Sequence, residues 1–476
     1  MLVQKNIYKA LFIVLFLTVL SFEASAVVAC SLKSATPGAY VDRFWVADPP
    51  SSGEKRWWHD NANWSATSNG SPGASAPTNG CYRVEFDGGS VVNASIYDGM
   101  SGPGYRINQL KVRSGYSGTI DLNGKNLKVT KNIAIWNGTI SVPTDSVLQN
   151  WQDLYIYSGG TVTASDAKVI SVKKNVHIYG ELTAPGGDHT RFVVHGGFRI
   201  HSGGTFNHNN GTVTLATQDP TGCANTSRAV NIEGGPGAGR NFYNLYKKAK
   251  KSVYLNTDIK VENDLTIIGN GCIKANGHNI TIGGDWYQKS KNNFQSSAGK
   301  VIFNGSSAQT IDSPAHNTSN KNFTNVQISN SDVSLIKDIK ITGTLTIDSG
   351  ATLDLNGYNL TAGTLANEGN LQLKGTESLT ITTKDTNSGP ITYDGTDTGL
   401  AYGNAYYNLA INSPSGTMTL DADLDVNGSL TIADGTLNTS NNDINVAGDW
   451  SNSGSFVSGT GKVIFDGNSN IVTGGT

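Results

Sequence analysis

The sequence is poor in charged residues and in long apolar runs, and each shortage excludes a class of protein. Charged residues make up 15% of the 476 residues, against about 25% in an ordinary soluble domain. The 35 Lys and Arg are balanced by 37 Asp and Glu, which argues against a nucleic-acid binder because such proteins need a dense basic field. After residue 26 there is no apolar run of about 18 residues, so we expect no transmembrane helix in the mature chain.

Sequence signatures of catalysis and of metal binding are also lacking. The chain contains no HExxH, no GxSxG, no P-loop and no EF-hand loop, the short patterns that carry metal, nucleophile, phosphate or calcium chemistry. No Cys/His spacing is typical of zinc. The sequence therefore predicts no cofactor, no metal site and no assigned catalytic residue.

The start of the chain, 1–26, is expected to be a signal peptide. Lys5 and Lys9 form a basic start, residues 10–22 are apolar, and Ala24-Ser25-Ala26 is a small-x-small cleavage signal. A buried core helix is the alternative interpretation of the apolar stretch. An exported protein, secreted or held at the cell surface, follows from the signal-peptide interpretation.

The four cysteines all lie in the exported part, where oxidation is expected. Their order favours the disulfides Cys30–Cys81 and Cys223–Cys272, although four cysteines allow three pairings. The segment 27–30 also resembles a bacterial lipobox, in which Cys30 would carry a lipid anchor. The two interpretations assign different chemistry to Cys30, and both stay open.

Sequence markers recur with one period, which is typical of a repeat protein. An aromatic-x-Asn-apolar marker is centred on Asn244, Asn325 and Asn408, which are nearly evenly spaced. A Leu-Thr-Ile segment follows each marker, at residues 265–267, 345–347 and 430–432. The chain therefore consists, at least in its later part, of copies of one structural unit.

Each unit is predicted to consist of short strands. Apolar and polar residues alternate between turns made by ten Asn-Gly and five Asp-Gly dipeptides, and helical periodicity is missing. Markers recur about every 20 residues, the length of one solenoid coil, so each unit would hold roughly four coils. The prediction is an all-β parallel β-helix (β-solenoid, right-handed); a string of β-sandwiches is the alternative.

The solenoid is expected to begin after a different N-terminal segment. The predicted organisation is a cap module over residues 27–100, divergent solenoid repeats over 101–240, and three repeats of about 81–83 residues over 241–476, the last incomplete. Four tryptophans lie in the cap module, where they serve either to cover the first coil or as a sugar-stacking platform. They are Trp45, Trp57, Trp58 and Trp64.

The order Trp57-Trp58, Asn63-Trp64, Pro77, Val84 and Phe86, followed by Gly-rich β-repeats, resembles repeat regions of bacterial surface proteins. Autotransporter passenger repeats and large adhesin-like secreted proteins open in a similar way. The resemblance covers about residues 42–476. It implies a bacterial cell-surface or secreted rod that serves adhesion or acts as an envelope scaffold, and it marks no active site.

Histidine is concentrated in one short stretch of the chain. In a solenoid, residues one coil apart stack on one face, so His177, His195 and His208 are expected to line up, with His189 and His201 close by. Such a line could form a metal or acid–base site. The alternative is a ladder of polar side chains without a function.

Three carboxylates form the second candidate cluster. Asp421, Asp423 and Asp425 alternate along one expected strand and would share a face. Aligned carboxylates could bind Ca²⁺ or serve a polysaccharide lyase or glycosidase; a solvated strand face is the alternative.

A short basic run follows one of the expected strands. It comprises Lys247, Lys248, Lys250 and Lys251. We interpret it as a solvated face, with contact to an anionic polysaccharide as the alternative.

Two functions from different classes follow from the sequence. The first is a non-enzymatic surface rod, whose partners would be an extracellular polysaccharide or a host or neighbouring cell surface. The second is a polysaccharide-active β-helix enzyme or a carbohydrate-binding surface protein. The last repeat stops after residues 471–473 without a capping coil, so end-to-end self-association is expected as well.

Overall fold

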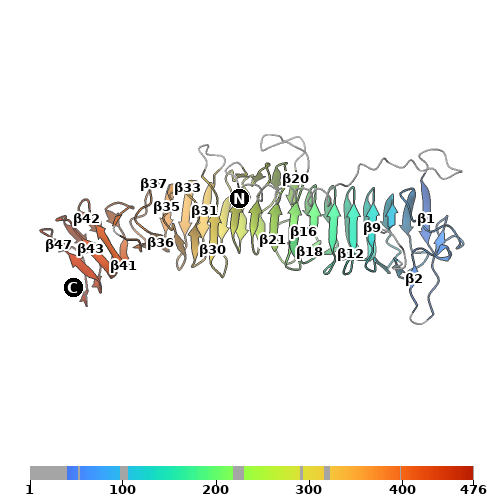
Figure 1. Cartoon of the computed structure of the whole chain (residues 1–476), viewed down its shortest axis with the longest axis horizontal. Coiled ribbons are helices and arrows are strands. Elements are labelled where there is room, and N and C mark those ends of the chain that lie inside the picture. Colours follow the sequence, from blue (N-terminus) through green and yellow to red (C-terminus); the bar gives the residue numbers. More distant parts are fainter. Residues whose placement is uncertain are drawn as a thin grey trace, which may run out of the picture.

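The computed structural model describes residues 40–51, 54–96, 105–217, 230–289, 293–315, 322–396 and 398–474. They form a long rod, with the N-terminal strands at one end and the C-terminal strands at the other (Figure 1). The chain winds through about 16 turns of a parallel β-solenoid, which confirms the predicted all-β parallel solenoid; its right-handedness stays a prediction. The one helical element among the described residues is a short 3-10 helix, Asn61–Asn63.

One parallel ladder runs along the rod from β6 to β48; we call it the long ladder. Its strands pair in parallel one coil apart, as β21 does with β24 and β24 with β27. The long ladder comprises β6 (Tyr105–Ile107), β9 (Asn126–Val129), β11 (Val147–Asn150), β13 (Val169–Val172), β16 (Gly187–Val194), β19 (Gly211–Leu215), β21 (Asn244–Lys247), β24 (Leu265–Ile267), β27 (Trp286–Gln288), β30 (Gln309–Asp312), β32 (Val333–Leu335), β34 (Thr352–Asp354), β36 (Asn370–Leu373), β38 (Pro390–Tyr393), β39 (Thr398–Gly399), β41 (Asn408–Thr419), β43 (Leu430–Asn438), β45 (Trp450–Asn452), β46 (Ser455–Val457) and β48 (Ile471–Thr473).

An N-terminal sheet of 17 strands covers the other sides of the first coils. It has two arms, joined where the long strands β10 (Ile133–Ser141) and β12 (Leu154–Thr163) bend and take part in both. The first arm holds β1 (Val41–Trp45), β3 (Trp64–Ser65), β4 (Tyr82–Phe86), β7 (Gln109–Val112), β14 (Val176–Ile178), β17 (Phe198–Ile200), β20 (Val230–Glu233), β22 (Val253–Leu255), β25 (Ile273–Lys274) and β28 (Phe294–Gln295). The second arm holds β2 (Arg56–Trp57), β5 (Ala94–Ser95), β8 (Thr119–Asp121), β15 (Glu181–Thr183) and β18 (Thr205–Asn207).

Two smaller parallel sheets lie on the later coils, and the first of them begins before the N-terminal sheet ends. The middle sheet holds β23 (Ile259–Val261), β26 (Ile280–Ile282), β29 (Lys300–Phe303), β31 (Asn325–Ile328), β33 (Ile339–Ile347), β35 (Leu360–Asn367) and β37 (Leu379–Thr383). The C-terminal sheet holds β40 (Ala405–Tyr406), β42 (Leu424–Val426), β44 (Ile444–Val446) and β47 (Val463–Phe465).

The alternating pattern of the strands explains the core. In the Leu-Thr-Ile segments the two apolar residues of each strand point inward and are 0% exposed, while the threonine between them is half-buried. They are Leu265, Ile267, Leu345, Ile347, Leu430 and Ile432. The Asn-Gly dipeptides make the expected tight turns, as at Asn123 (φ 49°) and Gly124 (φ 76°), because these two residue types tolerate positive φ.

The sequence repeat does not match a whole number of coils. In the long ladder, residues paired from strand to strand connect Leu245 with Leu335, which lies four coils further on. The counterpart of Leu245 in the next sequence repeat is Val326, which the chain reaches before the fourth coil is complete. Each unit therefore holds slightly fewer than the roughly four coils expected. The marker strand lies in the long ladder at Asn244, in the middle sheet at Asn325 and in the long ladder again at Asn408.

An aromatic cluster lies at the N-terminal end of the solenoid. Trp45, Trp58 and Trp64 are 0% exposed and surround Phe86 with ring centroids 5.5, 5.7 and 5.8 Å away. Their indole N–H groups donate to backbone carbonyls at 2.7 to 2.9 Å, so burial leaves no donor unpaired. Side chains buried in this way fill the interior of the first coils, whose strands pair in parallel with the next coil. They offer no stacking surface for a sugar; Trp57 is half-buried.

Several expectations fall on residues outside the described ranges. These are the signal peptide, the lipid anchor at Cys30, and the disulfide partners Cys30 and Cys223, so both predicted pairings stay predictions. Neither Cys81 nor Cys272 is a free thiol. Within the described residues, no helix is long and apolar enough to span a membrane.

The last described coils expose apolar side chains. Ile471 and Val472 of β48 are 57% and 62% exposed, and Ile464 and Phe465 of β47 are 43% and 38% exposed. The expected end-to-end association stays a prediction.

Candidate functional site

Two columns of rings stack on the outer face of the first arm; we call them the aromatic ladder. One column contains Trp136, Tyr157, Tyr179 and His201, with ring centroids 4.8, 5.6 and 3.8 Å apart and planes within 12° of parallel. The other column places Tyr155 over His177, with centroids 4.6 Å apart.

The backbone register produces this stacking. Tyr155 and His177 are directly paired in neighbouring strands, and residues that pair in a parallel sheet lie about 4.8 Å apart on the same face. All six rings except His177 are half-buried, and His177 is 8% exposed. Because the ring faces cover one another, the ladder presents ring edges and hydroxyl groups to the solvent.

Ion pairs lie at both ends of the ladder. At one end the Arg113 guanidinium lies over the Trp136 ring, 4.9 Å from its centroid, and Arg113 Nε is 2.5 Å from Glu85 Oε1. At the other end Arg199 Nε is 3.1 Å from Glu233 Oε1. A charged pair therefore closes each end of an otherwise uncharged row of rings.

The structure corrects the expected line of histidines. His177 does not meet His195 or His208; its partner is His201, whose Nε2 lies 3.2 Å from His177 Nδ1. His195 follows β16 in the long ladder, where its Nε2 is 3.0 Å from Lys173 Nζ. His208 follows β18 in the second arm, where its Nε2 is 3.1 Å from Glu262 Oε2. The three candidates thus lie on three different sides of the rod.

Burial favours the neutral form of three histidines of this region. It lowers the pKa of His177 and of His201, and it lowers the pKa of His195 to about 4, with the neighbouring Lys173 adding to the effect. Among the described residues, no group of three or more His, Cys, Asp or Glu is placed to hold a metal ion.

Acid is therefore expected to destabilise this part of the rod. Because the pKa of His195 is lower in the fold than in the unfolded chain, its contribution to stability is present above about pH 6.5 and is lost as the pH falls toward 4. We expect a loss on the order of 2 kcal/mol from this residue over that range. Thermal melts at pH 7 and pH 4.5 should show a smaller acid shift for His195→Gln than for the wild type. An equal shift would contradict the prediction, and His59→Gln, at an exposed position, is the control.

The three aspartates do not form one acidic strand face. Strand β42 begins at Leu424, so only Asp425 lies on it, while Asp421 and Asp423 precede it. All three are exposed. The expected alternating carboxylate face is wrong because the chain turns at the position where a strand was expected.

Asp423 instead has a structural role that many polar side chains of this protein share. Its Oδ1 accepts a hydrogen bond from the backbone N–H of Asp443, 2.9 Å away, and Asp443 in turn accepts from Lys462, 2.8 Å away. Each bond joins one coil to the next. Hydrogen bonds of the same kind, from a backbone N–H to a side-chain oxygen one coil earlier, join Asp264 to Asn244, Asp285 to Asp264, and Thr310 to Asp285.

The basic run at residue 247 is also not a solvated face throughout. Lys248 and Lys250 are exposed, but Lys247 is 0% exposed and occupies a core position. Its Nζ donates to the carbonyls of Ala249, 2.8 Å away, and Gly271. Burial lowers the pKa of Lys247 to about 7.

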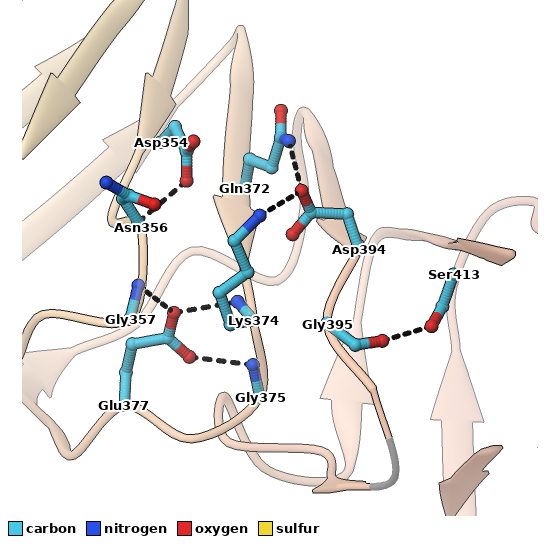
Figure 2. Close-up of polar contacts among 10 residues, drawn as sticks. All are labelled: Asp354, Asn356, Gly357, Gln372, Lys374, Gly375, Glu377, Asp394, Gly395 and Ser413. Atoms are coloured by element: carbon cyan, nitrogen blue, oxygen red, sulfur yellow. Dashed lines mark hydrogen bonds and ion pairs between the residues drawn. The ribbon is translucent and has the colours of Figure 1, made fainter. Parts of the chain in front are cut away.

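A polar cluster that the sequence did not reveal lies on the long ladder at β34, β36 and β38; we call it the acid–amine cluster (Figure 2). Asp394 Oδ2 accepts from Gln372 Nε2 at 2.9 Å and from Lys374 Nζ at 2.5 Å. Asp354 Oδ1 accepts from the backbone N–H of Asn356 at 2.7 Å. Burial raises the pKa of Asp354, and the nearby carboxylate of Asp394 raises it further.

Glu377 fixes the turns beneath this cluster. It is 5% exposed, and its carboxylate accepts from the backbone N–H groups of Gly357, Lys374 and Gly375 at 3.1, 2.7 and 2.7 Å (Figure 2). A carboxylate with three such donors is a structural anchor.

Sequence spacing contained a signal for the aromatic ladder. Trp136, Tyr157, Tyr179 and His201 follow one another at nearly equal intervals, each the length of one coil. For the acid–amine cluster no comparable signal exists, because its members are common residue types at irregular spacing. Comparison of the chain with protein-family models, curated proteins and solved structures finds no match.

Proposed function

We propose that the protein is a non-enzymatic extracellular rod that serves adhesion or scaffolding and holds a polysaccharide or a cell surface along its side. The aromatic ladder carries this proposal. It repeats the same kind of contact on four successive coils, and a repeating surface suits a partner that itself repeats. The ring edges offer hydroxyl and imidazole groups for hydrogen bonds beside apolar carbon, a combination that favours sugars.

Carboxylates bonded between coils support a structural role for the polar side chains. Asp423, Asp443, Asp264 and Asp285 each accept a backbone hydrogen bond from the next coil. A carboxylate held in this way stabilises the rod, because an N–H left unpaired at a coil corner costs free energy.

Affinity electrophoresis against a panel of plant and microbial polysaccharides tests the proposal. We expect at least one polymer to retard the protein without releasing reducing ends or unsaturated products. The double variant Tyr157→Ala/Tyr179→Ala should weaken this retardation by about tenfold, since it removes two hydroxyl groups and each hydrogen bond to a sugar contributes about 0.5–1.5 kcal/mol. Tyr254→Ala, which removes a half-buried tyrosine outside the ladder, is the matched control, and loss of binding in both variants would argue against the ladder.

A polysaccharide-active enzyme is the second candidate, and the acid–amine cluster favours it. A carboxyl with a raised pKa, Asp354, lies near an ion-paired carboxylate, Asp394, and acid–base pairs of glycan-cleaving enzymes consist of two carboxyls in different environments. Released product that disappears in Asp394→Asn, with the fold intact, would replace the first proposal by this one.

A further inference from the structure

A cationic and aromatic surface lies on the long ladder, on a different side of the rod from the aromatic ladder. It is built on successive coils by Arg106 of β6, Lys128 of β9, Trp151 directly after β11, and Lys173 directly after β13. We call these four residues the Trp151 site. They extend over three coil spacings, about 14 Å along the rod.

Trp151 lies among the cations. Lys128 Nζ is 4.3 Å and the Arg106 guanidinium carbon 5.6 Å from the centroid of the Trp151 ring. The side chain of Trp151 is 40% exposed, so part of its surface is open to a ligand from the solvent.

The charges of the Trp151 site point to an anionic ligand. Among the described residues, no ion pair includes Arg106 or Lys173. Arg106 Nε is buried and has no hydrogen-bond partner. Burial and the positive charges of Arg106 and Lys173 also lower the pKa of Lys128, as expected where like charges are gathered.

We propose that the Trp151 site binds an acidic polysaccharide, with the indole packed on a sugar ring and Arg106, Lys128 and Lys173 facing its carboxylate or sulfate groups. This inference rests on the proposed function in one respect, that the partner is a polysaccharide. It adds that the polysaccharide is acidic and that it binds on a second side of the rod. Arginine binds planar carboxylates and sulfates through paired N–H groups. Cations repeated from coil to coil match a polymer with regularly spaced anions.

Pairs of polymers that share a backbone test the proposal on the full chain. Dextran sulfate is compared with dextran, and polygalacturonate with its methyl ester, by affinity electrophoresis at several salt concentrations. We expect one charged polymer of these pairs to retard the protein at least tenfold more strongly than its neutral counterpart. The retardation should fall as salt rises, because salt screens exposed charges, and whether dextran sulfate or polygalacturonate binds distinguishes sulfate from carboxylate.

Variants distinguish binding at the Trp151 site from nonspecific attraction between the polymer and other positive charges of the protein. Trp151→Ala and Lys128→Ala/Lys173→Ala should each weaken binding at least tenfold, and the double variant should also reduce the dependence of log affinity on log salt by about two. The matched controls are Tyr287→Ala, an equally exposed aromatic residue of the long ladder (40%), and Lys289→Ala/Lys462→Ala at exposed positions. They should bind as the wild type does. Circular dichroism and thermal melts verify that each variant is folded.

Three results would overturn the proposal. The first is equal retardation by charged and neutral polymers. The second is wild-type binding by folded Trp151→Ala and Lys128→Ala/Lys173→Ala. The third is equal, Trp151-dependent binding of double-stranded DNA, which would replace the polysaccharide by a nucleic acid. If the protein bound only neutral polymers, and Tyr157→Ala/Tyr179→Ala abolished that binding, the proposal for the Trp151 site would be wrong. The proposed function would then still hold.

Discussion

Replacement of Leu265 by aspartate is expected to unfold the coils around β24. Leu265 is 0% exposed and lies between Leu245 and Trp286 of the neighbouring coils. A carboxylate at this position would lie among apolar side chains. The buried amine of Lys247 in the paired strand already donates to two backbone carbonyls. We expect a loss of more than about 4 kcal/mol, because an unpaired buried charge is among the costliest single changes.

The damage should be local along the rod. Each coil of a solenoid contacts mainly its neighbours, so amide hydrogen exchange should lose protection from β21 to β27 while the aromatic cluster around Phe86 keeps it. Thr266→Asp, at the outward-facing neighbour of Leu265, should cost less than about 1 kcal/mol. If the two variants were equally stable, the assignment of inward and outward residues in this strand would be wrong.

Replacement of Lys247 by methionine is expected to stabilise the protein at neutral pH. Lys247 occupies a core position between Leu215 and Ile267 of the adjacent coils, where its neighbours are apolar. Its pKa of about 7 in the fold, against 10.5 ordinarily, measures the cost of burying the charged amine, on the order of 5 kcal/mol. Methionine removes this cost but leaves the carbonyls of Ala249 and Gly271 without their donor, so we expect a net gain of roughly 2–3 kcal/mol.

The pH dependence distinguishes this explanation from better packing alone. Because the pKa of Lys247 is lower in the fold than in the unfolded chain, the unfolded chain binds the proton more tightly. The stability of the wild type should therefore rise between about pH 7 and pH 10.5. The advantage of Lys247→Met should shrink accordingly when urea unfolding is compared at pH 7 and pH 9.5.

Lys248→Met is the matched control for this experiment, because Lys248 is exposed and its replacement should leave the pH dependence unchanged. A variant Lys247→Met that is less stable than the wild type at pH 7 would show that the buried amine stabilises the rod. The same advantage at both pH values would assign the gain to packing.

The strands themselves were predictable because their pattern is local. Alternation in segments such as Leu265-Thr266-Ile267 decides which side chains point inward, and Asn-Gly pairs such as Asn123-Gly124 decide where the chain turns. Both signals act over a few residues, so they do not depend on which coil lies next to them. The spacing of Trp136, Tyr157 and Tyr179 belongs to the same kind of signal, since it equals the length of one coil.

Which residues meet across coils depends on the length of every coil between them. One coil from His177 leads to Arg199, its partner in the next strand. His201 lies two positions after Arg199, and its side chain reaches His177 across the two coils. The shorter interval from His177 to His195 carries the chain only part of the way round. The markers at Asn244 and Asn325 lie in different sheets for the same reason. A few extra residues in one turn change which later residues lie on a given side of the rod.

The sequence by itself therefore determined the all-β repeat architecture, the alternating core and the tight turns, since each follows from neighbouring residues. Only the tertiary structure decided that Lys247 is buried, that Asp423 bonds to the next coil, and that Trp151 lies among cations from earlier coils. These contacts depend on the register between coils, and that register is set by the lengths of all the turns that precede it along the rod. Patterns among a few neighbouring residues contain no information on the combined length of the preceding turns.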